Sequence, residues 1–149
     1  YIVGTLMGKT RSGDYIVLDV RRMRIRPGDW EREILDAWRV DREQFRNVVT
    51  LIPQDPGASG QMAVNLLCKS LAEYGVITEK MRASGKKLDR FRPFSAMAQN
   101  GGIKFVIGCG NDYENNIKND NNFIYKELEA FDGLRRRGES GHDRVCCRV

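Results

Sequence analysis

Asp55 is the acid whose sequence context best suits a metal ligand. It lies in the stretch 48–60, which reads VVTLIPQDPGASG. The β-branched apolar run before Asp55 is typical of a buried strand, and the small residues after it are typical of a loop. A carboxylate at such a junction is held rigidly and still faces solvent, as a metal ligand must. Asp55 is therefore the first candidate site residue. The alternative is that Asp55 only starts a turn, because Asp-Pro-Gly is a common turn sequence.

The second candidate is the pair His142 and Asp143 in SGHDRV, near the far end of the chain. Hard divalent ions such as Mg²⁺ or Mn²⁺ prefer carboxylate oxygens and tolerate an imidazole as a further ligand. Two ions about 3.5 to 4 Å apart activate a water and stabilise the leaving oxygen in phosphodiester cleavage. Asp55 and Asp143 could share such ions if the fold brings them together. The alternative is an exposed tail pair with no ligand, since terminal segments are often loose.

Other chemistries have less support. The sequence contains neither a G-x-x-x-x-G-K-[ST] phosphate loop nor a G-x-S-x-G nucleophile elbow. Its four cysteines lack paired C-x-x-C spacing, and there is one histidine, so structural zinc is not expected. Reduced cytosolic thiols are the simplest interpretation of the cysteines.

The 149 residues carry a formal net charge of +5, and the basic residues are clustered. One cluster includes Arg21 and Arg24, and another includes Lys86, Lys87 and Arg90. Such clusters suit contact with the phosphates of a polyanion, although a charge run is often only a solvated face. The length indicates one domain, and the apolar runs are too short to cross a bilayer, so no membrane partner is expected.

The elements that must position these residues alternate between strand and helix. Runs 1–9 and 15–26 read as a β-hairpin. Asp29 is expected to cap a helix of roughly fifteen residues, whose apolar stripe ends at Val40 or Asp41. The Val48 strand, a helix over 61–74 and a strand over 76–81 form a βαβ unit, which implies a parallel strand pair. These elements predict a mixed sheet with helices on its faces.

The chain from residue 86 onward is less regular. A helix is expected over 86–98, interrupted early by Pro93, followed by a fifth strand or edge hairpin over 103–107. Residues 111–122 are polar and show no periodicity, and helical spacing resumes over 123–131.

In this order, the pieces resemble the nuclease domain of the large terminase subunit of tailed bacteriophages, an RNase H-like endonuclease. The resemblance covers nearly the whole chain and rests on five stretches: TLMGKTRSGDYIVLDVRRMRIRP, IPQDPGASG, MRASGKKLDRFRPFSAMAQNGGIKFV, YKELEAFDG and GHD. The first and third are the most specific. The resemblance implies an α/β fold, namely an RNase H-like mixed sheet flanked by helices.

The resemblance also implies a function and a site. It implies a Mg²⁺- or Mn²⁺-dependent endonuclease that cleaves concatemeric viral DNA during genome packaging in the host cytoplasm. Asp55 matches the family's second metal-binding acid, and His142 and Asp143 match its terminal His-Asp motif. Lys86, Lys87 and Arg90 match basic positions near DNA. The implied partners are double-stranded DNA, the terminase ATPase domain, the small terminase subunit and the portal.

Two departures from the family pattern shape the expectation. The family's first catalytic acid lies on a central strand that would precede Tyr1, so residues 1–149 are expected to be an N-terminally truncated nuclease domain, without its first strand and without the ATPase domain. Asp19 matches a non-catalytic position and does not replace that acid. The family's tail reads His-Asp-Asp, whereas here Arg144 follows Asp143. The rival expectations are a non-catalytic DNA-binding or docking module, and another RNase H-like enzyme such as a resolvase or transposase-type recombinase.

Overall fold

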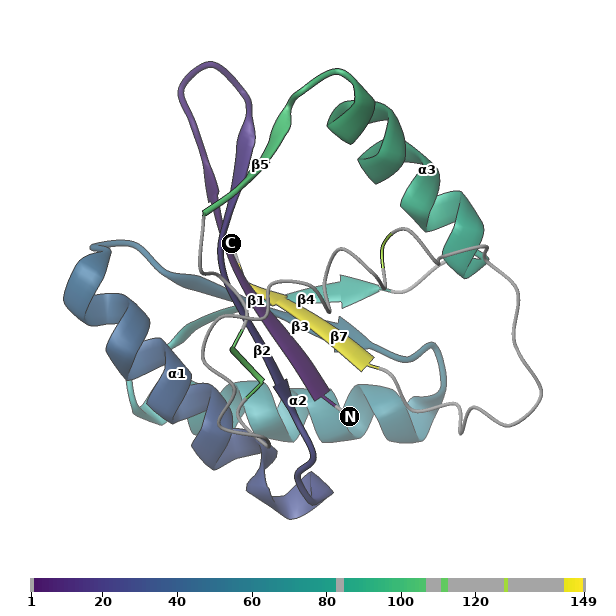
Figure 1. Cartoon of the computed structure of the whole chain (residues 1–149). Helices are drawn as coiled ribbons and strands as arrows, with labels where there is room; N and C mark the ends of the chain where they lie inside the picture. Colours follow the sequence, from purple (N-terminus) through teal and green to yellow (C-terminus); the bar gives the residue numbers. More distant parts are fainter. Residues whose placement is uncertain (1, 83–84, 107–110, 113–127, 129–143, 149) are drawn as a thin grey trace.

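The chain opens with an antiparallel hairpin, as its sequence predicts. The structure is a computed structural model, and it describes residues 2–82, 85–106, 111–112, 128 and 144–148. Strand β1 (Ile2–Lys9) pairs with β2 (Tyr15–Met23), with an irregularity in register between Leu6 and Met7. Gly13 takes a positive φ of 96° in the connecting turn, which a residue without a Cβ adopts easily. The hairpin is the long pair of strands in Figure 1.

Helix α1 (Trp30–Gln44) follows a short 3₁₀ turn, η1 (Pro27–Asp29), and has the fifteen residues expected. The predicted N-cap position of Asp29 is confirmed. Asp29 precedes the helix, but its backbone is already helical (φ −93°, ψ −4°) and its side chain makes no capping hydrogen bond. A capping residue needs extended backbone to turn its side chain back onto the free N–H groups. The Asp29 carboxylate instead lies 3.5 Å from the Arg32 guanidinium.

The predicted βαβ unit is present. Strand β3 (Val49–Gln54), helix α2 (Ala58–Glu73) and strand β4 (Ile77–Arg82) follow one another, and β3 pairs with β4 in parallel. Gly75 ends α2 with a φ of 80°. The helix starts three residues earlier than expected, so Gly60 lies in its first turn and not in a loop.

Helix α3 (Lys87–Gln99) continues through Pro93, so the expected interruption is wrong. The φ of proline is compatible with a helix. Its ring and its missing N–H usually disturb one, but α3 accommodates Pro93. Strand β5 (Ile103–Phe105) and the two-residue strand β6 (Asn111–Asp112) both pair in parallel with β2. Figure 1 shows α1 and α2 close together and α3 apart from them.

The strands form one mixed sheet in the order β4-β3-β7-β1-β2-β5, with β6 also on β2. Strand β7 (Arg144–Arg148), which the sequence did not predict, lies at the centre. It runs parallel to β1 over five paired residues and antiparallel to β3, where Thr50 pairs with Arg148. A central place in the sheet, where the absent first strand was expected, is therefore held by β7.

Two apolar clusters support the sheet. The first joins α1, α2 and β3, and its buried members are Leu35, Ile52, Cys68, Leu71 and Val76. The second surrounds Val17 and Val20 of β2 and includes Leu128, the one described residue of the helix expected over 123–131. The rest of that helix lies outside the described residues. Within the described part of the chain, no helix is long and apolar enough to cross a bilayer.

Candidate functional site

Asp55 lies directly after β3 and before the first turn of α2, at the junction that the sequence predicts. The strand that leads to it is fixed by burial, because Thr50 is fully buried and Ile52 is 4% exposed. Asp55 itself is exposed. The site candidate is thus a carboxylate that reaches solvent from the end of a rigid strand, which suits a metal ligand.

The first turn of α2 lies very close to Asp55. A Cβ built on Gly60 would lie 2.8 Å from the Cβ of Asp55 and 3.4 Å from its carbonyl oxygen. No side chain fits at position 60 without movement of one of these two segments. Glycine at this position therefore lets the helix start beside the acid.

A cavity of about 730 Å³ lies beneath this junction, between the sheet and helices α1 and α2. Both Asp55 and Gly60 line it, and most of the other lining residues are apolar. Among its few polar groups, the Ser70 hydroxyl donates a hydrogen bond of 2.5 Å to Glu31, which ties α2 to α1. The inner surroundings of Asp55 are thus largely apolar, which favours a carboxylate directed outward to solvent.

The other predicted ligands, His142 and Asp143, lie outside the described residues. The next residue, Arg144, begins β7 and pairs with Ile2 of β1. Because β7 runs antiparallel to β3, with Arg148 opposite Thr50, β7 begins at the end of the sheet where β3 ends. The chain that follows Asp143 therefore enters the sheet at the same end as Asp55.

The donor types of the predicted site fit a hard divalent ion. Carboxylates with one imidazole are ligands that Mg²⁺ or Mn²⁺ accepts, whereas zinc favours thiolates. Among the residues that the structure describes, no group of three or more His, Cys, Asp or Glu side chains comes together. In the described part of the chain, Asp55 is the one member of the predicted metal site.

Arg21, a predicted DNA contact, is engaged by two carboxylates. Its guanidinium lies 2.7 Å from Asp19 and 3.4 Å from Asp41, and its side chain is 16% exposed. Asp41 is 2% exposed, whereas the neighbouring Val40 is 45% exposed. Helical spacing had left Val40 and Asp41 as alternatives, and the acid takes the inward position because Arg21 compensates its charge there.

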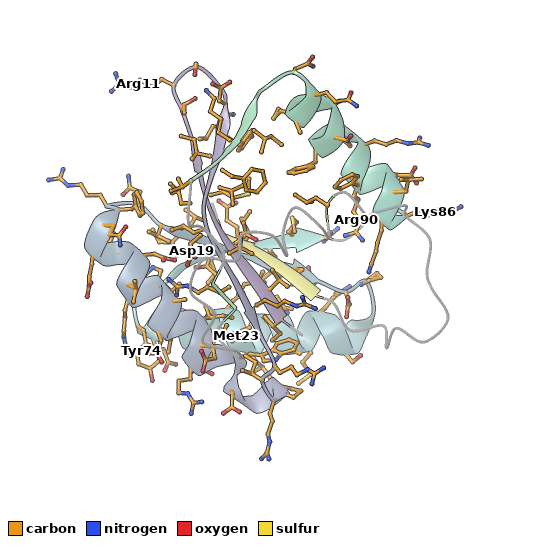
Figure 2. The ribbon with its side chains drawn as sticks, in the orientation of Figure 1. Arg11, Asp19, Met23, Tyr74, Lys86 and Arg90 are labelled. Atoms are coloured by element: carbon orange, nitrogen blue, oxygen red, sulfur yellow. The ribbon has the colours of Figure 1, made fainter. Side chains whose placement is uncertain are left out.

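The other predicted DNA contacts are exposed. Arg24 follows β2, and Lys86, Lys87 and Arg90 lie together at the N-terminal end of α3. Figure 2 shows Lys86 directed away from the molecule and Arg90 directed from α3 toward the side of β4. Within the described ranges, no carboxylate forms an ion pair with Lys86, Lys87 or Arg90, whereas Arg92 lies 3.7 Å from Asp89. With respect to the described carboxylates, these three cations are therefore available to phosphates.

Comparison with known proteins adds to this geometry. A family model described as the terminase RNaseH-like domain matches residues 1–143, a range that includes every predicted site residue. No curated protein and no solved structure gives a significant match. The mixed sheet with flanking helices agrees with an RNase H-like fold. The chain belongs to the terminase RNaseH-like domain family, and it is a nuclease-type domain of a DNA-packaging terminase.

Proposed function

We propose that this domain is a divalent-metal-dependent DNA endonuclease that cuts concatemeric viral DNA during genome packaging. Family membership supports the nuclease class. The observation that supports the site most directly is the direction of β7, whose first residue, Arg144, lies at the end of the sheet where β3 leads into Asp55. We infer that Asp143 comes close to Asp55 there, with His142 as an auxiliary ligand.

In this proposal, the carboxylates of Asp55 and Asp143 hold Mg²⁺ or Mn²⁺ at the end of the sheet where β3 ends and β7 begins. When bound, such ions supply a nucleophilic water at neutral pH and neutralise the leaving oxygen of the phosphodiester. The protein contributes a rigid support for Asp55 through buried β3. The cavity beneath Asp55 is lined mostly by apolar residues, so burial of a charged carboxylate there would be costly. The carboxylate is therefore expected to face outward, toward solvent and DNA.

The basic end of α3, which we define as Lys86, Lys87 and Arg90, is proposed to bind the DNA backbone. Its side chains are exposed, and their charge is not neutralised by described carboxylates. Arg24 is proposed as a further contact. Arg21 is a weaker candidate, because Asp19 and Asp41 occupy its guanidinium. Phosphate contacts of this kind position DNA without reading its sequence.

The proposed partners follow from the family. They are double-stranded DNA, the terminase ATPase domain, the small terminase subunit and the portal, in the cytoplasm of the host cell.

The test is nicking of supercoiled plasmid in Mn²⁺ by wild-type protein, Asp55→Asn and Asp36→Asn. Asp55→Asn keeps the side-chain shape and removes the charge that a divalent ion requires. Asp36 is a matched control, an exposed acid on α1 that pairs with Arg39 at 3.0 Å. We expect Asp55→Asn to abolish nicking and Asp36→Asn to leave it unchanged. Equal nicking by all three proteins would remove Asp55 from the site.

A second candidate function is a DNA-binding or docking module without cleavage. It is favoured by one observation, that Arg144 follows Asp143 where the family's tail has a second Asp. Salt weakens DNA binding in both cases, so binding alone does not separate them. Cleavage product in Mn²⁺ separates them, because only the endonuclease would form it. Branched DNA cut in preference to linear DNA would instead indicate a resolvase-type enzyme.

A further inference from the structure

The contact between Gly60 and Asp55 carries an inference about how the site is built. The three atoms nearest to a Cβ placed on Gly60 all belong to Asp55: its Cβ at 2.8 Å, its carbonyl oxygen at 3.4 Å and its Cα at 3.6 Å. None of them is the mobile end of a long side chain. A methyl group at position 60 could therefore be accommodated only if the backbone at Asp55 or the first turn of α2 moved.

We propose that Gly60 is a positioning residue, which fixes the Asp55 carboxylate at the metal by allowing α2 to start against it. This inference rests on the proposed function of Asp55 as a ligand. Carbon atoms in contact normally lie about 3.5 to 4.0 Å apart, so relief of the contact needs a shift of roughly half an ångström or more. A metal site tolerates displacement of about that size before its geometry fails.

The neighbouring glycine provides a matched control. Gly57 also lies at the start of α2, and a Cβ built there would meet nothing within 4 Å. Its backbone (φ −71°, ψ 152°) is ordinary for alanine. Gly60 is inside the helix, where alanine is a better helix former than glycine. Loss of function in Gly60→Ala would thus not be explained by helix propensity.

The experiment measures Mn²⁺ affinity by titration calorimetry for the full chain and for Gly60→Ala and Gly57→Ala. Changes in residues that orient a ligand typically weaken metal affinity 10- to 100-fold. We expect a loss of at least about tenfold for Gly60→Ala and less than about twofold for Gly57→Ala. Equal affinities for Gly60→Ala and wild-type protein would overturn the inference.

A second measurement, made without metal, keeps the inference testable if Gly60→Ala is poorly stable. Asp55→Gly removes the Cβ that lies 2.8 Å away, so Gly60→Ala should lower the melting temperature in the wild-type background and not in Asp55→Gly. An equal decrease in both backgrounds would show that the effect does not pass through Asp55, and would overturn the inference. Failure of wild-type protein to bind Mn²⁺ would instead overturn the proposed function, and with it the role of Gly60.

Discussion

At the scale of single residues, the ion pair between Arg21 and Asp41 shows how burial decides the role of a charge. Asp41 is 2% exposed on α1, and the Arg21 guanidinium of β2 lies 3.4 Å away. Arg21 compensates the charge of this buried acid, and Asp19, 2.7 Å from the same guanidinium, is its second carboxylate partner. The pair therefore links α1 to the sheet. Because its guanidinium is already held by carboxylates, Arg21 stabilises the fold and is a weak candidate for DNA contact.

This pair gives a prediction with a control on the same helix. Asp41→Ala should lower the free energy of unfolding by about 1 to 3 kcal/mol, because it removes a buried hydrogen-bond partner of Arg21 while the closer carboxylate of Asp19 remains. Asp36→Ala, which removes an exposed pair with Arg39, should lower it by less than about 0.5 kcal/mol. Urea unfolding followed by circular dichroism measures both changes. A similar small change for the two variants would show that Asp41 is not held in a buried pair.

At the scale of elements, α2 connects the core to the site. One of its faces is anchored by Leu71, which is fully buried among Leu35, Ile52, Cys68 and Val76. Its first turn lies so near Asp55 that a Cβ on Gly60 would be 2.8 Å from the Asp55 Cβ. The position of the predicted ligand therefore depends on how firmly this helix packs on β3.

Two leucines of α2 test that packing. Leu71→Ala should lower the free energy of unfolding by about 2 to 5 kcal/mol, through lost burial and the cavity left behind. Leu66, on the same helix, is 59% exposed, so Leu66→Ala should change it by no more than about 0.5 kcal/mol. Both substitutions change helix propensity equally, and chemical denaturation measures the difference. Equal losses would mean that α2 does not pack as described.

Helix α3 carries the proposed DNA surface. Replacement of Lys86, Lys87 and Arg90 by Gln should weaken DNA binding and reduce the slope of log K against log salt by up to about 2.7, since each phosphate contact contributes about 0.9. A control with the same loss of charge replaces Arg32, Arg39 and Lys69 of α1 and α2. Fluorescence anisotropy at several salt concentrations measures both slopes. The same reduction in the control would indicate that only net charge matters.

At the scale of the whole molecule, β7 joins two halves of the sheet. In the described residues, β3 and β4 lie on one side of it and β1, β2 and β5 on the other. Deletion of residues 144–149 should therefore destroy the single cooperative unfolding transition, whereas deletion of Val149 alone should preserve it. Calorimetry measures the transition. An unchanged transition after the longer deletion would show that β7 is not the central strand.

Features that depend on residues near one another in the sequence could be predicted, whereas features that depend on distant residues could not. The hairpin, α1 and the βαβ unit come from local periodicity, and all three are confirmed. The central position of β7 could not be predicted, because spacing along RVCCR does not report its partners β1 and β3. The site follows the same rule. The strand-end position of Asp55 was predictable, whereas the contact with Gly60 depends on where α2 begins.

The most direct test of the central claim locates bound Mn²⁺ by the paramagnetic broadening of backbone amide signals in NMR spectra. The proposed site predicts that the signals of Asp55, Gly57, Gly60 and Arg144 disappear first. Those of Arg11 and Gly13, in the hairpin turn, should persist, and Asp55→Asn should abolish the selective loss. Broadening centred on another part of the chain, or unchanged in Asp55→Asn, would contradict the proposal that Asp55 and Asp143 share a divalent ion.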